Sequence, residues 1–537
     1  MEINRIIRVD MTTKSVSEEI SPPELAMLGG RALSAHMLLE ETDARAHPLS
    51  REAKLFIAPG LLGGTAVTTS GRTSFGFKSP LTGGTKEANV GGQLGHKLAR
   101  LGIKLIVVSG ASNDGWQRLD IDSNGVRISD ASELVGRSNY DLHRELVGEA
   151  LMTRCAATIG PAGEQRLSAA SVAITDPEGR PTRHAARGGP GAVMGAKGLK
   201  AIVVDDSDAP RIIPGERKDE FKREVVKFSK VVLEDPRTHN LHKTGTAGVV
   251  KFVNRENIQS MPTRNHRAGT WSFADTISGQ EIERLGEERG GKMLPCMAGC
   301  IIKCAILFND EHGNHVTTAL EFESIALLGS NCEIGPADEV AELDRLCDDI
   351  GLDTIEMGNA VGVAMEAGVV PWGDWEGTKK LLEEVRMGTP LGRIIGNGTA
   401  HVAKTFGIDR VPVVKGQGLP AWEPRTLKGM GITYSTSPQG ADHTAGMVTA
   451  RGVTPETLVK QSRQEQLVMM AIDSMGVCQF TNALPEDMAR FVSDRFDIEW
   501  DGAEVLKMAR AGIDAELEFN RRAGFDKEDD RLPKWML

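Results

Sequence analysis

The chain has 537 residues, too many for one compact core, so its length predicts two to four domains. Hydrophobic residues make up 40% and charged residues 26%, as in ordinary globular proteins. The net charge of −11 argues against a nucleic-acid partner, because phosphate contacts need a surplus of Lys and Arg. The sequence shows no secretory signal and no stretch near the roughly 18 apolar residues of a membrane span. We therefore expect a cytoplasmic protein with no membrane partner.

Short β-rich runs dominate the first part of the chain. They lie between stretches dense in Gly, Ser and Thr, at 5–9, 54–58, 103–109 and 201–204. Beyond residue 215 the apolar periodicity predicts mainly helices, for example at 218–233, 338–349, 355–367 and 455–473. A loop-rich span at 411–442 separates two helical blocks. The pattern predicts an α+β multidomain protein, with a β-rich N-terminal domain (1–210) followed by two mainly α-helical domains (211–410 and 411–537).

Two glycine-rich segments are suited to bind a phosphate group. The first is 68–72 together with 89–92, and the second is 183–191. Glycine lets backbone N–H groups approach phosphate oxygens, and the segments supply positive charge through Arg72, Arg183 and Arg187. The second segment does not match the spacing G-x-G-x-x-G, so it does not predict a nicotinamide site. Either loop, taken alone, could also be a tight turn with solvated arginines.

The pattern D-x-x-G-[L/V]-[D/C] occurs twice, as DDIGLD at 348–353 and as DSMGVC at 473–478. Each copy follows a predicted helix, and its glycine suits the left-handed residue just past a helix C-terminus. In the first copy, Asp353 is expected to cap the next helix, with Glu356 completing a capping box. Either copy alone could be a plain joint between two helices, but the second copy ends in a cysteine.

Three of the seven cysteines crowd into residues 296–304. Thiolates are soft ligands, and such spacing suits zinc or an iron–sulfur cluster. A straight helix would separate the first and third cysteines by roughly 12 Å, so the chain must bend, and Cys478 is the candidate fourth ligand. Structural zinc sites usually use paired CxxC motifs, which this chain lacks, so a cluster is favoured. The other cysteines are expected to be small core residues: Cys155, Cys332 and Cys347.

Taken together, these segments resemble the aldehyde:ferredoxin oxidoreductase family of tungstoenzymes. The resemblance rests on collinear blocks over most of the chain: GGRALSAHMLLEE, LFIAPGLLGGTAVTTSGRTSFGFKSPLTGG, ATIGPAGE, RGGPGAVMGAKGLKAIVV, LEFESIALLGSNCEIG, DDIGLDTIEMGNAV, GADHTAG and DSMGVCQF. It implies a bis-pterin cofactor with tungsten, or molybdenum in its place, at the domain interface beside a [4Fe–4S] cluster. One departure concerns the cluster, because the family usually has C-x-x-C-x-x-x-C and both gaps here contain three residues.

The resemblance also implies roles for individual residues. Arg72 and Arg183 correspond to residues near the pterin phosphates, and Asn89, with the backbone of His184, corresponds to the site of a bridging Mg²⁺. The implied cluster ligands are Cys296, Cys300, Cys304 and Cys478. The other expected cofactor-binding residues are Arg187, Asp348, Gly351, Leu352, Asp353, Asp473, Gly476 and Val477.

The reaction implied by the family is oxidation of an aldehyde to a carboxylic acid, with electrons leaving through the cluster to ferredoxin or an iron–sulfur subunit. Such chemistry needs groups that move protons, and Glu323 and His443 match the family's active-site carboxylate and imidazole. Their plainer interpretations are a helix-surface acid and a hydrogen-bonded loop histidine. We expect a homo-oligomer or a subunit of a larger complex.

Three other functions are compatible with parts of the sequence. The chain could be the catalytic subunit of a larger redox complex that acts on another substrate, such as an aromatic acyl thioester. It could be a non-catalytic iron–sulfur electron relay, although a relay has no use for two pterin turns and two arginine loops. A zinc-stabilised binding protein is the third possibility, and metal analysis would separate it from the others.

Overall fold

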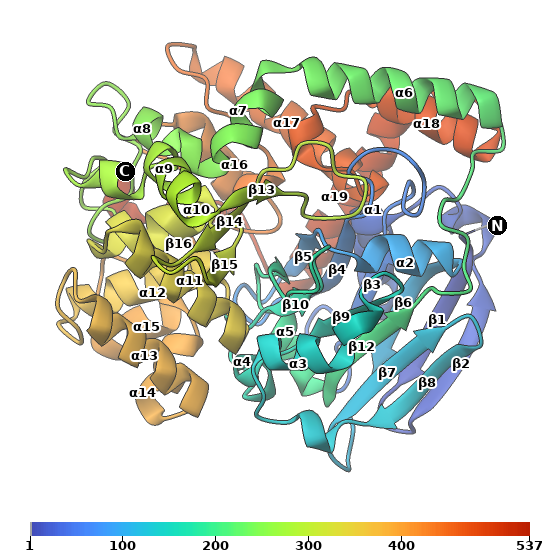
Figure 1. The fold of residues 1–537 in the computed structure, drawn as a ribbon, viewed down its shortest axis with the longest axis horizontal. Helices are drawn as coiled ribbons and strands as arrows, with labels where there is room; N and C mark the ends of the chain where they lie inside the picture. The colour runs from blue at the N-terminus through green and yellow to red at the C-terminus, as the bar shows by residue number, and fades with distance from the viewer. Residues whose placement is uncertain (1–2) are drawn as a thin grey trace.

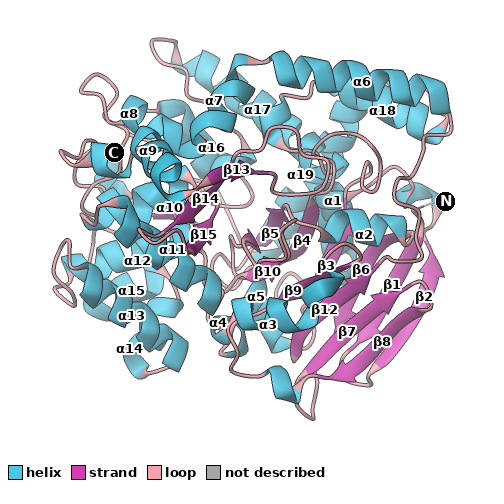
Figure 2. Ribbon diagram, viewed as in Figure 1, coloured by secondary structure: helices cyan, strands magenta, loops and turns pink. Residues whose placement is uncertain are grey.

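The computed structural model describes residues 3–537, and its N-terminal part contains two six-stranded sheets (Figures 1 and 2). The strands of the first sheet are β1 (Arg5–Asp10), β2 (Ser15–Ile20), β3 (Leu55–Pro59), β4 (Thr73–Lys78), β5 (Thr85–Val90) and β6 (Ile103–Ser109). The strands of the second are β7 (Gln117–Asp122), β8 (Gly125–Asp130), β9 (Arg154–Thr158), β10 (Val172–Ile174), β11 (Arg183–Ala185) and β12 (Leu199–Asp205).

The two sheets have the same topology. Their strand orders are β2-β1-β6-β3-β4-β5 and β8-β7-β12-β9-β10-β11, so each strand of one sheet has a counterpart six strands later. In each sheet the pair β1–β6 or β7–β12 is parallel and the other pairs are antiparallel. The connecting helices also correspond: α1 (Gly30–Glu41) with α3 (Asn139–Leu146), and α2 (Leu94–Arg100) with α5 (Pro190–Ala196). The N-terminal part is therefore a structural duplication.

One apolar core joins the two sheets. Alternate residues of each strand point to opposite faces, so Ile7 and Val9 of β1 lie in this shared core while Ile6 lies on the other face. Helices α2 and α5 contribute to the shared core through residues such as Leu98 and Met194. Helix α1 covers the opposite face of the first sheet, and α3 covers that of the second.

The rest of the chain is mainly helical. Its longer helices are α6 (Lys218–Glu234), α7 (Pro236–Thr244), α9 (Gly279–Arg289), α11 (Ala337–Ile350), α12 (Thr354–Glu366), α13 (Trp375–Met387), α15 (Thr399–Phe406), α16 (Lys428–Thr436), α17 (Pro455–Met475), α18 (Pro485–Phe496) and α19 (Gly502–Ala523). The shorter ones are α8 (Val250–Val253), α10 (Phe322–Ser324) and α14 (Pro390–Gly396), and α4 (Pro161–Glu164) belongs to the N-terminal part, between β9 and β10. The remaining strands are β13 (Lys292–Leu294), β14 (Ala305–Asn309), β15 (His315–Thr318), β16 (Val413–Val414) and β17 (Gln417–Gly418).

The fold class predicted from the sequence is confirmed, since a β-rich part precedes mainly helical parts. Helices α1 and α16 are among the elements that differ from the expectation. Helix α1 was not expected, because its first turns are buried on all sides and leave no polar stripe to reveal the period. Helix α16 lies inside the predicted loop at 411–442, where Gly, Ser and Thr obscure a helix that packs through Met430 and Tyr434. The boundaries at 210 and 410 stay a prediction. Between residues 3 and 537, no helix is both long and apolar enough to cross a bilayer.

Candidate functional site

The turn at 473–478 is held by a loop that follows strand β3. Helix α17 ends at Met475, and Gly476 is left-handed with φ of 76°. The loop pairs with this turn through its backbone, because Leu61 N donates to Ser474 O at 3.1 Å and Arg72 N donates to Gly476 O at 3.1 Å. The two backbones approach most closely at Gly60 and Gly476, where a Cβ atom on either residue would lie within 3 Å of the other. This explains why glycine occurs on both sides of the contact.

The turn at 348–353 is held in the same way by the loop that follows strand β9. Gly351 is left-handed with φ of 81°, and Ser171 N donates to its carbonyl oxygen at 2.9 Å. Asp353 N donates to Ala169 O at 3.0 Å. Since β3 and β9 are counterparts in the duplicated sheets, the two turns occupy equivalent positions on the N-terminal part.

Gly60 allows the closest of these backbone approaches. A Cβ atom at this position would lie 2.2 Å from Gly476 N and 2.3 Å from Met475 C. We expect Gly60→Ala to displace the turn at 473–478, lower stability by about 1–3 kcal/mol and reduce the content of the tungsten–pterin cofactor that the family resemblance implies. Metal and pterin content per chain, measured after purification, checks this. Gly286→Ala on helix α9 is the control, because its Cβ would lie 3.8 Å from Gly291 Cα, an ordinary van der Waals contact. Equal pterin content in the two variants would contradict the prediction.

Asp353 caps helix α12 as predicted, but the prediction that Glu356 completes a capping box is wrong. The Asp353 carboxylate accepts from Ile355 N at 3.0 Å. Glu356 instead accepts from Thr399 N and Gly418 N, both at 2.8 Å, because this carboxylate is fully buried beside those two unpaired backbone donors. Burial raises the pKa of Asp353 to about 6, against the opposing effect of Arg187.

Of the residues expected to contact phosphates and Mg²⁺, all but Arg72 lie on the neighbouring edge strands of the two sheets, and Arg72 directly precedes β4. Asn89 is on β5 and His184 is on β11, and these strands contact each other. Arg72 donates to the Asn89 side chain and, at 3.1 Å, to the Asn89 backbone oxygen. The His184 side chain lies 3.1 Å from an oxygen of Asp348, so it joins this edge to the first turn. Arg183 lies near Glu321, with 3.8 Å between Nη1 and Oε1.

Arg187 occupies a different place from the other two arginines. It donates to Gly418 O at 2.7 Å and to Ala441 O at 2.6 Å, and it lies 3.5 Å from Asp353. This guanidinium therefore links the first turn to the segment that carries His443. The Nε atoms of Arg183 and Arg187 are buried and make no hydrogen bond within residues 3–537, so each retains a donor for a bound group.

The four candidate cluster ligands are buried and interact electrostatically with one another. The Cys296 thiol forms a hydrogen bond with Cys300 that raises the pKa of Cys296 and lowers that of Cys300. Burial raises the pKa of Cys304, and the nearby Cys296 and Cys478 add to this effect. Burial likewise raises the pKa of Cys478 to about 11, although Arg72 opposes it. Four thiols at one place, from segments more than 170 residues apart in sequence, are the donor set that a metal cluster requires.

The cysteine segment at 296–304 is a non-helical loop between strands β13 and β14. Gly299 has φ of 75°, and Cys300 N donates to Met297 O at 3.3 Å, which accommodates the three-residue gap in a turn. The loop is fastened to the N-terminal part by Thr68, whose hydroxyl donates to Gly299 O at 2.9 Å. In the described chain, no three His, Cys, Asp or Glu side chains are arranged to hold one metal ion. A four-iron cluster is wider than an ion and needs its thiolates farther apart.

Glu323 and His443 face each other across 3.7 Å, between Oε1 and Nδ1. The other oxygen of Glu323 accepts from Ala421 N at 2.7 Å, which fixes the carboxylate. The two facing atoms are buried, and no partner among residues 3–537 satisfies either of them. A π-helical turn (Ile325–Gly329) follows Glu323, and such turns often occur at functional sites. The pair is therefore fixed in position, with both facing atoms free to bind or move a proton.

Sequence reasoning missed several residues that build the site. Asn139 donates to Asp348 O at 2.8 Å and so supports the first turn. Glu321 lies between Arg183 and the cysteines, and burial raises its pKa. Arg31 forms two hydrogen bonds of 2.9 Å with Glu516, both residues being buried. The adjacency of Glu321 to the Glu323 motif could have indicated that residue, but no spacing in the sequence indicates the others.

Comparisons with known proteins define the class. The family model for the N-terminal domain of aldehyde ferredoxin oxidoreductase matches residues 6–206, and the model for domains 2 and 3 matches residues 224–537. The tungsten-containing aldehyde ferredoxin oxidoreductases of Pyrococcus furiosus and Thermococcus kodakarensis are each 32% identical, over 99% of this chain and 91% of theirs. A WOR-like subunit of an aliphatic sulfonate oxidoreductase from Pyrococcus furiosus is 28% identical, over 89% of this chain and 79% of the relative.

A solved structure shares the fold. The active-site complex BamBC of benzoyl coenzyme A reductase, in complex with 1,5-dienoyl-CoA, superposes with a TM-score of 0.82 at 21% identity, covering 100% of this chain and 91% of the other. The family models and the two relatives at 32% identity establish an oxidoreductase. The chain belongs to the aldehyde ferredoxin oxidoreductase family.

Proposed function

We propose that this enzyme is a tungsten bis-pterin oxidoreductase that converts an aldehyde to a carboxylate and delivers electrons through a [4Fe–4S] cluster to ferredoxin or a similar iron–sulfur protein. The observation that carries the proposal is the convergence of two equivalent backbone turns, four buried thiols and the Glu323–His443 pair. An electron relay would not need the last of these. The unpaired cysteines suit a reducing compartment such as the cytoplasm.

The residues present fit the cofactor set. Each turn at 348–353 and 473–478 would hold one pterin, and Arg72 and Arg183 would bind the phosphates, with Arg183 offering a buried and unused Nε donor. Asn89 would offer Mg²⁺, which prefers oxygen ligands, the amide oxygen that accepts a hydrogen bond from Arg72 in this structure. The cluster would be held by Cys296, Cys300, Cys304 and Cys478. When bound, the tungsten centre would supply a Lewis acid that accepts an electron pair.

The protein's own groups would manage protons. Oxidation of an aldehyde consumes one water and releases two electrons and three protons as the carboxylate forms. The free Oε1 of Glu323 can accept one proton, while the hydrogen bond from Ala421 N holds the other oxygen in place. The free Nδ1 of His443, 3.7 Å away, can accept another or orient the carbonyl oxygen. Burial excludes bulk water and strengthens both interactions.

Elemental analysis of the anaerobically purified protein tests the cofactor set. About four iron atoms and one tungsten or molybdenum per chain are expected, with pterin phosphorus in proportion. Zinc alone would contradict the proposal. Reduction of a viologen dye that depends on an added aldehyde then tests the substrate class. The chain would be assigned to a different reaction of the same scaffold if no aldehyde supported dye reduction. An aromatic acyl thioester that oxidises the reduced dye would identify that reaction.

A further inference from the structure

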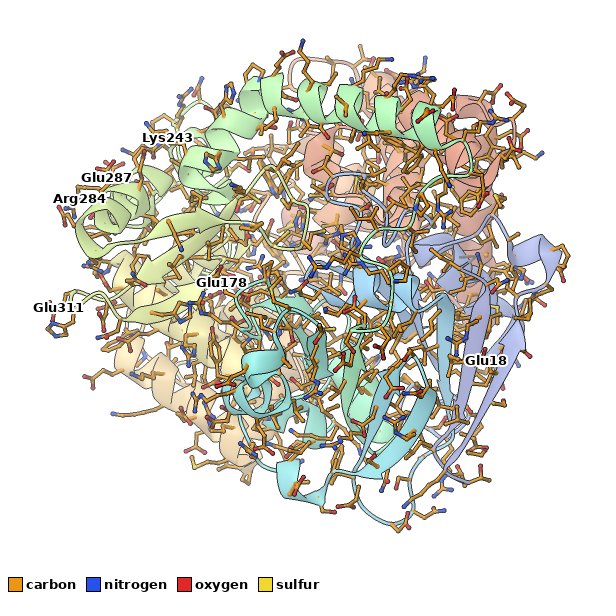
Figure 3. All side chains as sticks on the ribbon, turned by 45° about the vertical axis from the view of Figure 1, so that its right-hand side comes forward. Glu18, Glu178, Lys243, Arg284, Glu287 and Glu311 are labelled. Carbon is orange, nitrogen blue, oxygen red and sulfur yellow. The ribbon has the colours of Figure 1, made fainter. Side chains whose placement is uncertain are left out.

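Lys86 is a buried lysine that reaches from the N-terminal sheet into the segment carrying His443. Charged side chains normally project into solvent, as Figure 3 shows for Lys243, Arg284 and Glu287. The Lys86 side chain is only 1% exposed. Its ammonium donates to Asp442 Oδ2 at 2.5 Å and to Gln439 Oε1 at 2.8 Å. A charge in this position is stable only because its partner is equally buried and hydrogen-bonded.

Asp442 uses its second oxygen to hold the turn that carries His443. Oδ1 accepts from Thr444 N at 3.0 Å and from the Thr444 hydroxyl at 2.8 Å, which caps the short helical turn His443–Ala445. The same oxygen lies 3.9 Å from His443 Nδ1. The carboxylate is thus fixed at both ends, by Lys86 on β5 and by the turn itself.

We propose that Lys86 is a positioning residue for the reaction: its ammonium holds the Asp442 carboxylate that caps the His443 turn, and so fixes the imidazole opposite Glu323. The kinetic part of the test rests on the proposed function, because it measures aldehyde turnover, whereas the infrared part does not. Lys86 touches neither facing atom of the Glu323–His443 pair, so its effect passes through Asp442.

The charges around Asp442 support an ionised carboxylate. Burial alone would raise the pKa of Asp442, but Lys86, followed by Arg187 and His443, holds it well below its usual range. The other titratable groups near this segment are Glu323 on α10, Tyr434 on α16 and Glu465 on α17. Without the ammonium, only Arg187 and His443 would oppose burial, so the pKa of Asp442 would rise, and a protonated Asp442 would be a weaker cap.

The same network reaches the second pterin turn. Gln439 donates to Glu516 Oε1 at 2.8 Å, Glu516 pairs with Arg31, and Arg31 lies 3.4 Å from Asp473 Oδ2. Lys86 therefore joins a chain of buried polar groups that extends from the Glu323–His443 pair to the turn at 473–478. A change at Lys86 would displace His443 before it affects the turn at 473–478, because only Asp442 lies between Lys86 and His443.

The test uses the holoenzyme with Lys86→Met, Lys86→Gln, Lys86→Arg, Asp442→Asn and the double variant Lys86→Met/Asp442→Asn. Lys86→Gln keeps polar contacts without charge, so it replaces Lys86→Met if the latter does not fold. Lys97→Met is the matched control, because Lys97 also forms a buried pair, 2.8 Å from Asp206, in the N-terminal part. The measurements are kcat and KM against pH, and the infrared band of a protonated carboxyl group that Asp442→Asn abolishes.

In Lys86→Met and Lys86→Gln we expect kcat near neutral pH to fall about 10²-fold with little change in KM, and the protonated Asp442 band to appear. Activity should recover as the pH rises, because Asp442 ionises again above its raised pKa. Lys86→Arg should restore most of kcat, and the double variant should be no worse than Asp442→Asn alone. The control should show neither the band nor the new pH dependence.

Two results would overturn the inference. One is that Asp442 stays ionised in both Lys86→Met and Lys86→Gln. The other is that the loss of kcat in Lys86→Met/Asp442→Asn equals the combined losses of the two single variants. The infrared band is measured in the resting protein, so it decides the role of Lys86 even if the enzyme proves inactive towards aldehydes. Failure of the proposed function and failure of this inference are thereby separable.

Discussion

Glu323→Gln is expected to lower kcat for aldehyde oxidation by about 10²–10⁴-fold, the range for loss of a general acid–base group. Glutamine can still accept the hydrogen bond from Ala421 N, which Glu323 accepts at 2.7 Å, so the side chain should stay in place. It loses the proton acceptor that faces His443 across 3.7 Å. Since the change affects the reaction more than binding, KM should change little, and steady-state kinetics with a dye acceptor would show the split.

Glu342→Gln provides the control for this prediction. Glu342 lies on the surface of α11, where it pairs with Lys379 at 2.8 Å, and an exposed pair of this kind contributes little. The control should keep wild-type kcat, cluster content and melting temperature. A Glu323→Gln enzyme that retains kcat within about threefold of wild type would remove Glu323 from the proton-transfer role.

Cys478→Ser is expected to reduce the iron content from about four atoms per chain towards zero and to abolish electron transfer to ferredoxin. A serine hydroxyl is a hard, weakly acidic group that replaces a soft thiolate poorly. The residue also ends the turn at 473–478, and its backbone N donates to Thr69 Oγ1 at 3.2 Å. The fold around the turn should survive, because that backbone contact does not depend on the sulfur atom.

Cys155→Ala is the matched control for the cysteine substitution. Cys155 is also fully buried, but it lies in the core shared by the two sheets, where burial raises its pKa to about 12. Its loss should leave the iron content and the visible absorption of the cluster unchanged. Full iron content in Cys478→Ser, measured by metal analysis and electron paramagnetic resonance, would exclude Cys478 as a ligand.

Sequence reasoning succeeded where the signal is local. The strand at 103–109 and the helices beginning near 218 and 455 occur within two residues of the predicted bounds, because each is indicated by residues within one segment: a short β-branched run for the strand and apolar periodicity for the helices. Gly351 and Gly476 adopt the expected left-handed conformation for the same reason: helix termination is decided by neighbours along the chain. The periodicity and the helix-ending glycines could therefore be recognised in the sequence without knowledge of tertiary contacts.

What the sequence did not reveal depends on long-range packing. Lys86 and Asp442 are 356 positions apart, and nothing in a TKEAN segment distinguishes a buried lysine from a solvated one. The sheet β13–β15 was also missed, because its strands are short and the cysteine loop interrupts them. The duplicated sheets escaped detection as well, since two copies of one topology can retain their strand order after their residues have diverged.

The duplication has a consequence for the direction of electron flow. Two equivalent scaffolds would by themselves give a cofactor site with two interchangeable sides. The last residue of each turn breaks that equivalence, since Asp353 is a carboxylate near Arg187 and Cys478 is a thiol near three others. In the proposed holoenzyme, the pterin at the turn 473–478 would lie next to a cluster ligand, because Cys478 belongs both to that turn and to the group of four thiols. Together with the cysteine loop at 296–304, this difference would give the proposed holoenzyme one exit for electrons, on the side of Cys478, while the turn at 348–353 would bind and orient the other pterin.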